Sequence, residues 1–318
     1  MKSIFVGDPH VQPNNLEDAK SIFSLVEQTQ KSFNAQALII SGDLFHTHAV
    51  LRLEVVSFWQ RTIMQMSKVF TKVILLVGNH DMVGDKQREG QMSALDTLKM
   101  GLNNVKIIDG PEICEGWGFM PYFSDSEKFI EEANKLAAQG AKTLICHQAF
   151  DGSQFENGFY APEGIDQNRL LFTHVISGHI HKTQTIGRVF YPGTPKWDTL
   201  SDANETKGIW TFDGQWNLVD TSGVVEPIRT IVLTPDSDMA NLQLGAKTFV
   251  ELTGPSTWIG QVSKKLKGKC KIVARPTDSS KRKAHGKNTK TIFEYLENYS
   301  GVTDKNGVRS YLENLCVR

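Results

Sequence analysis

The stretch Ser41-Gly42-Asp43-Leu44-Phe45-His46 follows directly on the apolar run Ala37-Leu38-Ile39-Ile40. A short continuous apolar run of this kind predicts a buried strand. A carboxylate at the mouth of a buried strand is unfavourable unless something cationic meets it there. Asp43 therefore predicts that further groups of the chain gather around it.

The same layout, an apolar run that leads into polar residues, recurs four times. The four runs lead into Gly7-Asp8-Pro9-His10, Gly78-Asn79-His80-Asp81, His147 and Gly178-His179-Ile180-His181. Open α/β sheets place their ligands at the carboxyl ends of the strands. Because five strands deliver Asp, Asn and His side chains at that end, the sequence predicts a metal centre with Asp43 in its middle.

Strands and helices alternate in the first half of the chain, and strands alone follow. Helices are expected over 15–32, 51–70, 91–100 and 125–139, and a loop over the site is expected at 150–167. This succession favours a two-sheet α/β sandwich. The helix at 51–70 is apolar on more than one side. Its surplus apolar side either lies under other parts of the chain or faces a second subunit.

The chain of 318 residues is long enough for one large and one small domain. A large domain over 1–225 is expected to be followed by a small α/β domain over 226–276. The residues 277–290 have the composition of a basic linker, and 291–318 read as two short helices that dock onto another protein.

The net charge of zero hides a basic segment. Between Val262 and Lys290 there are eleven Lys or Arg and a single acid, Asp278. Such a segment suits a polyanion, and a solvated surface is the alternative. For Lys281–Lys290 the solvated linker is an equally good interpretation.

The cysteines are scattered and form no C-x-x-C pair, which fits reduced thiols in the cytoplasm. They are Cys114, Cys146, Cys270 and Cys316. The amino terminus leads straight into a strand, so no secretory leader is expected. No apolar run approaches the length of a membrane span. We expect a soluble cytoplasmic protein.

Oxygen and imidazole donors without a thiolate favour Mn²⁺, Fe²⁺ or Mg²⁺, and Zn²⁺ is also compatible. Of these, Mn²⁺ is the ion expected. The donors are too many for one ion. Two ions about 3.5–4 Å apart, bridged by a carboxylate, would use them all and supply a water of lowered pKa. The remaining histidines, His48, His174 and His285, are read as ordinary core or surface residues.

In their order along the chain, the motifs D-x-H, G-D, G-N-H-D, a lone His and G-H-x-H resemble the calcineurin-like metallophosphoesterases. The resemblance implies an α-β-β-α sandwich. It implies one metal site made by Asp8, His10, Asp43 and His181. It implies a second made by Asp43, Asn79, His147 and His179. His80 would act as an outer-shell acid, with Asp81 orienting it.

Within that superfamily the chain is most similar to the DNA double-strand-break repair nucleases, the SbcD-like branch in its bacterial or phage version. The form Gly42-Asp43-Leu44-Phe45-His46 is typical of this branch, in which His46 is implied to position DNA. The segment Tyr191-Pro192-Gly193-Thr194-Pro195 is also typical of this branch. It is followed by Glu205 and by Lys207-Gly208. The small second domain matches a capping domain in position and size.

This resemblance implies a Mn²⁺-dependent nuclease with double-strand exonuclease and single-strand endonuclease action. Its expected partners are DNA and an SMC-like (SbcC-type) ATPase, docked by the carboxyl-terminal helices. A homodimer is expected through helices around 51–70 and 88–101, and a phage-encoded version would work in the host cytoplasm.

Two other functions compete with this interpretation. A phosphatase or small-molecule phosphodiesterase could use the same scaffold, but it has no evident use for a second domain, a Lys-rich stretch and a docking tail. Phosphoprotein phosphatases also continue the second motif differently from Leu44-Phe45-His46. A scaffold that has lost catalysis would be expected to lack ligands, and none is missing from the sequence.

Overall fold

The computed structural model of the chain describes residues 1–48, 50–83, 93–161 and 163–278. Internal contacts divide the chain into two compact units, Met1–Thr230 and Ile231–Arg318. Within the described residues, no helix combines the length and the apolar character that crossing a bilayer requires.

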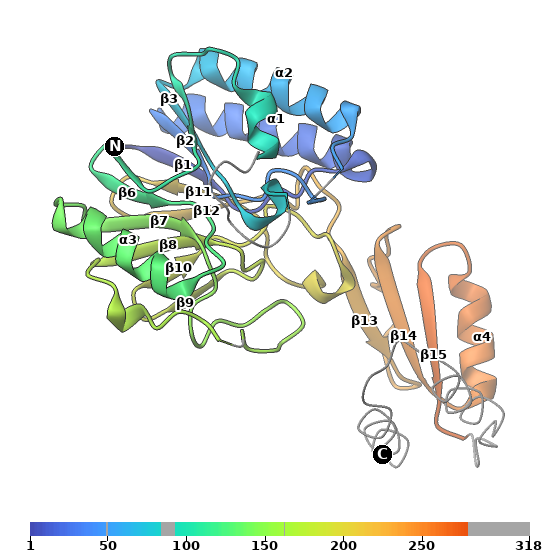
Figure 1. Cartoon of the computed structure of the whole chain (residues 1–318). Helices are drawn as coiled ribbons and strands as arrows, with labels where there is room; N and C mark the ends of the chain where they lie inside the picture. The colour runs from blue at the N-terminus through green and yellow to red at the C-terminus, as the bar shows by residue number, and fades with distance from the viewer. Residues whose placement is uncertain (49, 84–92, 162, 279–318) are drawn as a thin grey trace, which may run out of the picture. The chain divides into compact units, whose positions relative to one another are not determined.

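The first of two six-stranded sheets in the larger unit has the order β12-β11-β1-β2-β3-β4. Its strands are β1 (Ser3–Val6), β2 (Ala37–Ile40), β3 (Lys72–Leu76), β4 (Val105–Ile108), β11 (Gly208–Phe212) and β12 (Trp216–Asp220). Strands β1 to β4 run parallel, and β11 joins β1 in the antiparallel sense. Helices α1 (Leu16–Phe33) and α2 (Leu53–Val69) connect the first three strands and lie side by side on one face of the sheet (Figure 1).

The apolar pattern explains why these segments fold as they do. Every residue of β1 and β2 is buried, as expected for parallel strands covered on both faces. Helix α1 buries Ile22, Phe23 and Val26, whose spacing places them on one side of a helix with 3.6 residues per turn. The helix ends where Asn34 adopts a left-handed conformation (φ 56°) and donates its N–H to the carbonyl of Gln30.

The second sheet has the order β5-β6-β7-β8-β10-β9. Its strands are β5 (Glu112–Cys114), β6 (Trp117–Met120), β7 (Thr143–His147), β8 (His174–Gly178), β9 (Gln184–Ile186) and β10 (Val189–Tyr191). Helix α3 (Ser126–Ala138) packs onto this sheet through Phe129, Ala133 and Leu136 (Figure 1). The two edge strands β5 and β9 were not expected from the sequence, because three residues are too few to show a strand pattern.

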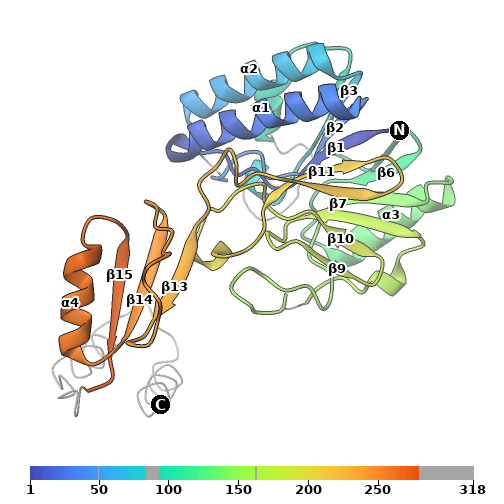
Figure 2. The same ribbon diagram turned by 180° about the vertical axis from the view of Figure 1, so that it is seen from behind.

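The two sheets pack face to face around a shared core (Figure 2). Phe5, Ile39 and Ile74 of the first sheet belong to the same buried cluster as Ile145 and Ile176 of the second. With α1 and α2 on one outer side and α3 on the other, the layers are α-β-β-α. The predicted two-sheet sandwich is therefore confirmed.

The helix expected at 91–100 takes a different form in the described part of that segment. Ala94–Leu98 is a short 3₁₀ helix. Ser93 accepts a hydrogen bond from the N–H of Leu95, and the Asp96 carboxylate accepts one from the N–H of Ser93. Both bonds tighten the first turn, which favours the narrower helix. Residues 84–92, which include part of the expected dimer helix 88–101, lie outside the described residues.

The second unit contains a three-stranded sheet of order β13-β14-β15. Its elements are β13 (Arg229–Leu233), β14 (Thr248–Gly254), α4 (Ser256–Leu266) and β15 (Lys271–Pro276). Strands β14 and β15 are parallel and α4 connects them, with Ile259, Val262 and Leu266 packed on the sheet. The boundary between the two compact units lies after residue 230 along the chain, five residues beyond the position 225 expected from the sequence. Apart from residues 277 and 278, the expected linker and docking tail lie outside the described residues.

Candidate metal centre

The five motifs meet at the carboxyl ends of their strands. Asp8 and His10 follow β1, Asp43 follows β2, and Asn79 follows β3. From the second sheet, His147 ends β7, and His179 and His181 follow β8. All seven residues expected to bind metal are therefore brought to one edge of the sandwich, although they come from both sheets.

Tight turns bring these side chains close together. Asp43, His10 and His179 all have positive φ angles (50°, 42° and 79°), a conformation that few non-glycine residues adopt. A side chain at Gly42 would overlap the ring of His147, and one at Gly78 would overlap the Asp43 carboxylate. The glycines before the ligands are thus required for close approach, and the positive φ angles are backbone strain of the kind that concentrates at functional sites.

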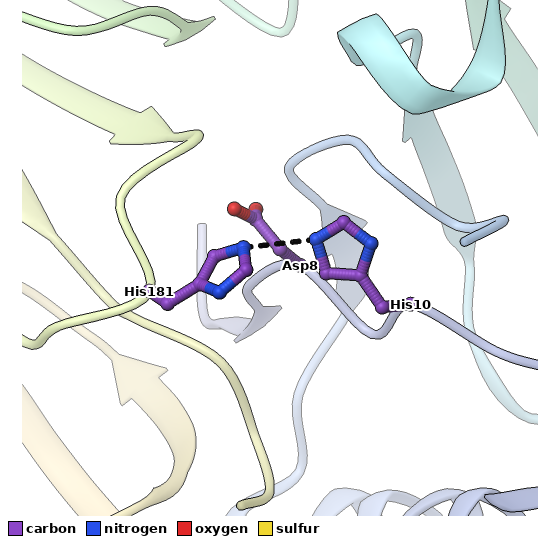
Figure 3. A group of neighbouring side chains, drawn as sticks. All are labelled: Asp8, His10 and His181. Atoms are coloured by element: carbon purple, nitrogen blue, oxygen red, sulfur yellow. Dashed lines mark hydrogen bonds between the residues drawn. The ribbon is translucent and has the colours of Figure 1, made fainter. Parts of the chain in front are cut away.

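One group of donors is formed by Asp8 and His10, from the loop after β1, and His181, from the loop after β8 (Figure 3). The Nε2 atoms of His10 and His181 are 2.9 Å apart. Within the described part of the chain, the other ring nitrogen of each histidine and one oxygen of Asp8 are buried without a hydrogen-bond partner. Buried polar atoms normally have partners. Since one ligand atom of each of these three residues lies within 4.8 Å of the others, the group has the donors of a cation site.

A second group surrounds the side-chain oxygen of Asn79. This oxygen lies 3.0 Å from Nε2 of His147 and 2.8 Å from Nδ1 of His179. The same Nε2 of His147 is 3.3 Å from Oδ2 of Asp43. Two imidazole nitrogens and two oxygens thus point at a common centre.

Asp43 belongs to both groups. Its Oδ2 lies 3.5 Å from Nε2 of His10 and 3.3 Å from Nε2 of His147. Its Oδ1 accepts a hydrogen bond of 2.8 Å from the backbone N–H of His80. The position between the two groups is the one that a bridging carboxylate requires.

The charge states of these residues suit divalent cations. Burial raises the pKa of the Asp8 carboxyl to about 8, while His147 and Asp43 act on it in opposite directions. Burial also opposes the charge on Asp43, but His147 and His10 hold its pKa below the ordinary range. Burial lowers the pKa of His179 to about 3, which keeps the ring in the neutral form that binds metal. His147 differs: burial opposes its charge, but the carboxylates of Asp43 and Asp8 raise its pKa to about 9, so this ring must give up a proton when a metal binds. Buried carboxyls and imidazoles are the donor types of an N/O metal site.

Neighbouring groups hold the ligands in place. The carbonyl of Ser41 lies 2.8 Å from Nδ1 of His147, so Nε2 is left to face the centre. The backbone N–H of His179 donates to Asp8 (2.7 Å). Glu156, from the loop over the site, has a carboxylate oxygen 3.8 Å from Nδ1 of His181. Carboxylates and carbonyls on the far nitrogen of a metal-binding histidine fix its orientation. None of these three contacts could be predicted from the sequence.

His80 lies beside the two groups, as expected, but other residues orient it. Its Nδ1 is 2.6 Å from the carbonyl oxygen of His46, and its ring stacks on His48 with 4.1 Å between centroids. His48, interpreted from the sequence as an ordinary residue, also bonds the carbonyl of Asn79 through Nδ1 (2.9 Å).

Asp81, expected to orient His80, contacts the backbone of the same turn and of the Asp43 loop. Its carboxylate accepts hydrogen bonds from the backbone N–H of Gly78 and of Phe45, both 3.0 Å long. It therefore fixes the turn that carries His80 and ties it to the Asp43 loop, while the described contacts of the His80 ring are to His46 and His48.

His46, the residue expected to position DNA, is an exposed side chain at the rim of the site. Its ring lies 5.5 Å from that of His10 and 6.0 Å from that of His80. Burial, reinforced by the nearby His80, lowers the pKa of His46.

The segment after β10 adds two buried lysines that the sequence did not single out as site residues. Lys196 is buried against Asp198, and burial lowers its pKa. Lys207 pairs with Asp202 at 2.6 Å, with both side chains fully buried, and donates to the carbonyl of His181 (2.8 Å). Lys207 therefore holds the loop that carries His181 through its backbone.

Three relatives share sequence with this chain. A putative phosphoesterase, 244L, of Invertebrate iridescent virus 6 is 32% identical over 202 residues, which is 61% of this chain and 69% of the relative. Exonuclease subunit 1 of Enterobacteria phage T4 is 25% identical over 177 residues, 54% of this chain and 51% of that protein. A subunit of the nuclease SbcCD of Staphylococcus epidermidis is 24% identical over 253 residues, 68% of this chain and 66% of that protein.

The matches cover about half of the phage protein and about two thirds of the other two relatives. The family model described as calcineurin-like phosphoesterase matches residues 1–183, which contain every ligand of both groups. The resemblance of the motifs is therefore confirmed at the level of the family, and the expected class of enzyme, a metal-dependent phosphoesterase, follows from it. This chain belongs to the calcineurin-like phosphoesterase family.

Proposed function

We propose that this chain is a DNA nuclease that cleaves phosphodiester bonds with two divalent ions, most readily Mn²⁺. The observation that carries the proposal is the position of Asp43 between two groups of N and O donors. One ion would be held by Asp8, His10, Asp43 and His181, and the other by Asp43, Asn79, His147 and His179. When bound, such a pair supplies a water of low pKa and stabilises the charge of an in-line displacement.

His80 is the residue best placed to move a proton. The carbonyl of His46 can only accept, so Nδ1 of His80 carries a hydrogen and Nε2 remains for the substrate. In the protonated ring, Nε2 can donate to the leaving oxygen of a cleaved ester. Stacking against His48 limits rotation of the ring, which keeps this nitrogen aimed.

DNA is proposed as the substrate on the strength of the relatives and of the second unit. Two relatives are named as an exonuclease subunit and a nuclease subunit. The exposed Lys264, Lys265 and Lys267 lie at the end of α4, where phosphate contacts by lysine give binding without sequence preference. The word subunit in both names also supports the proposal of an SMC-like ATPase as partner. Two further proposals rest on the sequence. The chain would associate with the ATPase through residues 291–318, and it would form a homodimer through 51–70 and 88–101.

The alternative is a phosphatase or small-molecule phosphodiesterase on the same scaffold. The name of the iridescent-virus relative, putative phosphoesterase, specifies no substrate and is compatible with it. The two functions differ in which substrate is cleaved by the same metal centre.

One assay separates them. The purified chain with Mn²⁺ is compared on linear duplex DNA, circular single-stranded DNA and a small chromogenic diester, with and without an SMC-like ATPase. Asp43→Asn serves as the control without a bridging carboxylate. We expect the wild-type chain to cleave both DNA substrates and the Asp43→Asn variant to cleave neither. Hydrolysis of the small diester with both DNAs intact would favour the alternative.

The contribution of α4 is tested by charge reversal. The triple variant with Lys264, Lys265 and Lys267 changed to Glu should bind duplex DNA more weakly. Its plot of log K against log salt should flatten by about 0.9 per lost contact. Reversal of Lys20, Lys68 and Lys128, exposed on α1, α2 and α3, is the matched control, because it changes the charge by the same amount. Equal binding by the two variants would remove α4 from the proposed interface.

A further inference from the structure

A cavity of about 350 Å³ lies between the two sheets, at the opposite end of the sandwich from the metal ligands. The two ends of strand β8 show how far the cavity lies from the metal ligands. His174, its first residue, lines the cavity, whereas the ligand His179 follows its last residue. Strand geometry of about 3.3 Å per residue places the two some 16 Å apart. The cavity lining contains none of the residues assigned to the metal centre.

Aromatic side chains form the walls of this cavity. Phe5 stacks on Trp117 (5.9 Å between centroids) and meets Trp216 edge-on (4.8 Å). Phe190 and Phe212 lie 4.7 and 4.8 Å from the same Trp216. All but Phe5 remain partly exposed although they face the interior of a sandwich. Rings in this arrangement offer faces and edges to another flat ring.

The polar side chains at the cavity include the cation Arg188, two indole N–H donors and the hydroxyls of Thr143 and Thr185. Arg188 uses Nη1 to bond the carbonyls of Leu170 and Phe172 (3.3 and 2.9 Å). Among the described residues, its Nε and Nη2 and the indole N–H groups of Trp117 and Trp216 have no hydrogen-bond acceptor. No Asp or Glu is part of the lining, and Arg188 forms no ion pair within the described chain. The cavity is therefore complementary to an anion or a strong acceptor.

We propose that this cavity binds a small planar aromatic carboxylate. The ring would lie among Phe5, Trp117 and Trp216, and the carboxylate would face Arg188. A cavity of this size is at the small end of ligand pockets and suits a molecule of one or two fused rings. Arginine is suited to the carboxylate because its planar fork presents parallel donors. The site is independent of the proposed nuclease activity.

Three probes separate the ring from the charge. Indole-3-acetate has both, indole has only the ring, and cyclohexylacetate has only the carboxylate with an aliphatic ring. Dissociation constants for the full chain are measured by ligand-observed NMR. We expect indole-3-acetate to bind about tenfold more tightly than indole, since a hydrogen bond to a charged group contributes about that factor. It should also bind up to about tenfold more tightly than cyclohexylacetate, because an aromatic pair contributes about 0.5–1.5 kcal/mol beyond area burial. Equal affinity for indole and indole-3-acetate would overturn the proposal.

Two variants locate the site. Arg188→Gln should remove the preference for the acid over indole, and Arg169→Gln, on a surface arginine paired with Glu127, should keep it. Thr185→Trp, at an exposed position of β9 that lines the cavity, should fill the entrance and abolish binding. This second variant changes no core residue, so it tests the site even if Arg188→Gln is unstable. Undiminished binding of indole-3-acetate by folded Thr185→Trp would show that the acid binds elsewhere.

Discussion

The two ring nitrogens of a histidine can face different groups, as His147 and His181 of the metal centre show. His147 turns Nε2 toward Asp43 and Nδ1 toward the carbonyl of Ser41. His181 turns Nε2 toward His10 and Nδ1 toward Glu156. The second partner decides which nitrogen is free to bind a metal. Residue type alone supplies a ligand, but only the fold supplies its orientation.

The role proposed for His80 can be separated from metal binding. His80→Ala should retain both ions, because the ring is not among the proposed ligands, and should cleave DNA about 10²- to 10⁴-fold more slowly, the usual effect of losing a general acid. Metal content by mass spectrometry and rates with Mn²⁺ measure the two effects. His174→Ala, on an exposed histidine far from the site, is the control. Loss of metal from His80→Ala would assign the residue a ligand role instead.

Glu156 is predicted to support His181. Glu156→Ala removes the carboxylate beside Nδ1 and should weaken binding of Mn²⁺ by about 10- to 100-fold, as is typical when the outer partner of a ligating histidine is lost. Glu156→Gln keeps an oxygen acceptor and should recover part of the loss. Glu163→Ala, on the same loop, is the control. Calorimetry measures the affinity, and equal affinity for the Glu156 and Glu163 variants would contradict the prediction.

At the scale of the element, the decisive structures are the sharp turns between strands and ligands. Gly42 has a φ of 112°, and the space that its Cβ would occupy is taken by the ring of His147. Gly116 also has a positive φ (79°), but no atom lies within 4 Å of its Cβ position. Substitutions at Gly42 and Gly116 therefore measure the effect of backbone strain with and without steric overlap.

The Gly42→Ala variant should both unfold more easily and lose metal binding, because His147 must move to admit the methyl group. Gly116→Ala should lose only about 1 kcal/mol of stability from backbone strain and keep full metal affinity. Urea unfolding and Mn²⁺ titration measure the two effects. If both variants bind Mn²⁺ equally well, the close approach at Gly42 is not what shapes the site.

Sequence patterns predicted the longer elements and missed the short ones for a physical reason. Helices α1, α2 and α3 bury regularly spaced apolar residues, and this periodicity is visible along the chain. The edge strands β5 and β9 owe their existence to neighbouring strands rather than to their own composition. At Ala94–Leu98 the hydrogen bonds of Ser93 and Asp96 favour a 3₁₀ helix over the α-helix that the pattern suggested.

At the scale of the whole molecule, the convergence of the five motifs was predictable because parallel strands all present their carboxyl ends at one edge. What completes the site comes from contacts over long sequence separations. Glu156 lies in a loop without a recognisable pattern, and only the closed sandwich brings it to His181. Lys207 belongs to a segment that the sequence singled out, but its bond to the carbonyl of His181 depends on the fold. His48 was missed because a histidine next to a motif has no distinguishing neighbour in the sequence.

The buried pair of Lys207 and Asp202 is predicted to tie the last part of the sandwich to the metal-facing loop. Lys207→Met leaves a buried carboxylate unpaired and should cost about 3–5 kcal/mol in the free energy of unfolding. The double variant with Asp202→Asn should be less destabilised than Lys207→Met alone. Lys20→Met, which breaks an exposed pair with Glu17, should cost less than about 1 kcal/mol.

The same pair predicts a dependence on pH. Burial opposes the charge on Asp202, but Lys207 and the backbone N–H of Thr199 lower its pKa below the ordinary value. A carboxyl whose pKa is lower in the folded state than in the unfolded state stabilises the fold. This stabilisation is fully present above the unfolded pKa of about 3.9, and it is lost as the pH falls through the pKa of the folded state. Urea unfolding at pH 7 and near pH 3 should therefore show a smaller difference between wild type and Lys207→Met at the lower pH. An unchanged difference would mean that protonation of Asp202 does not weaken the pair.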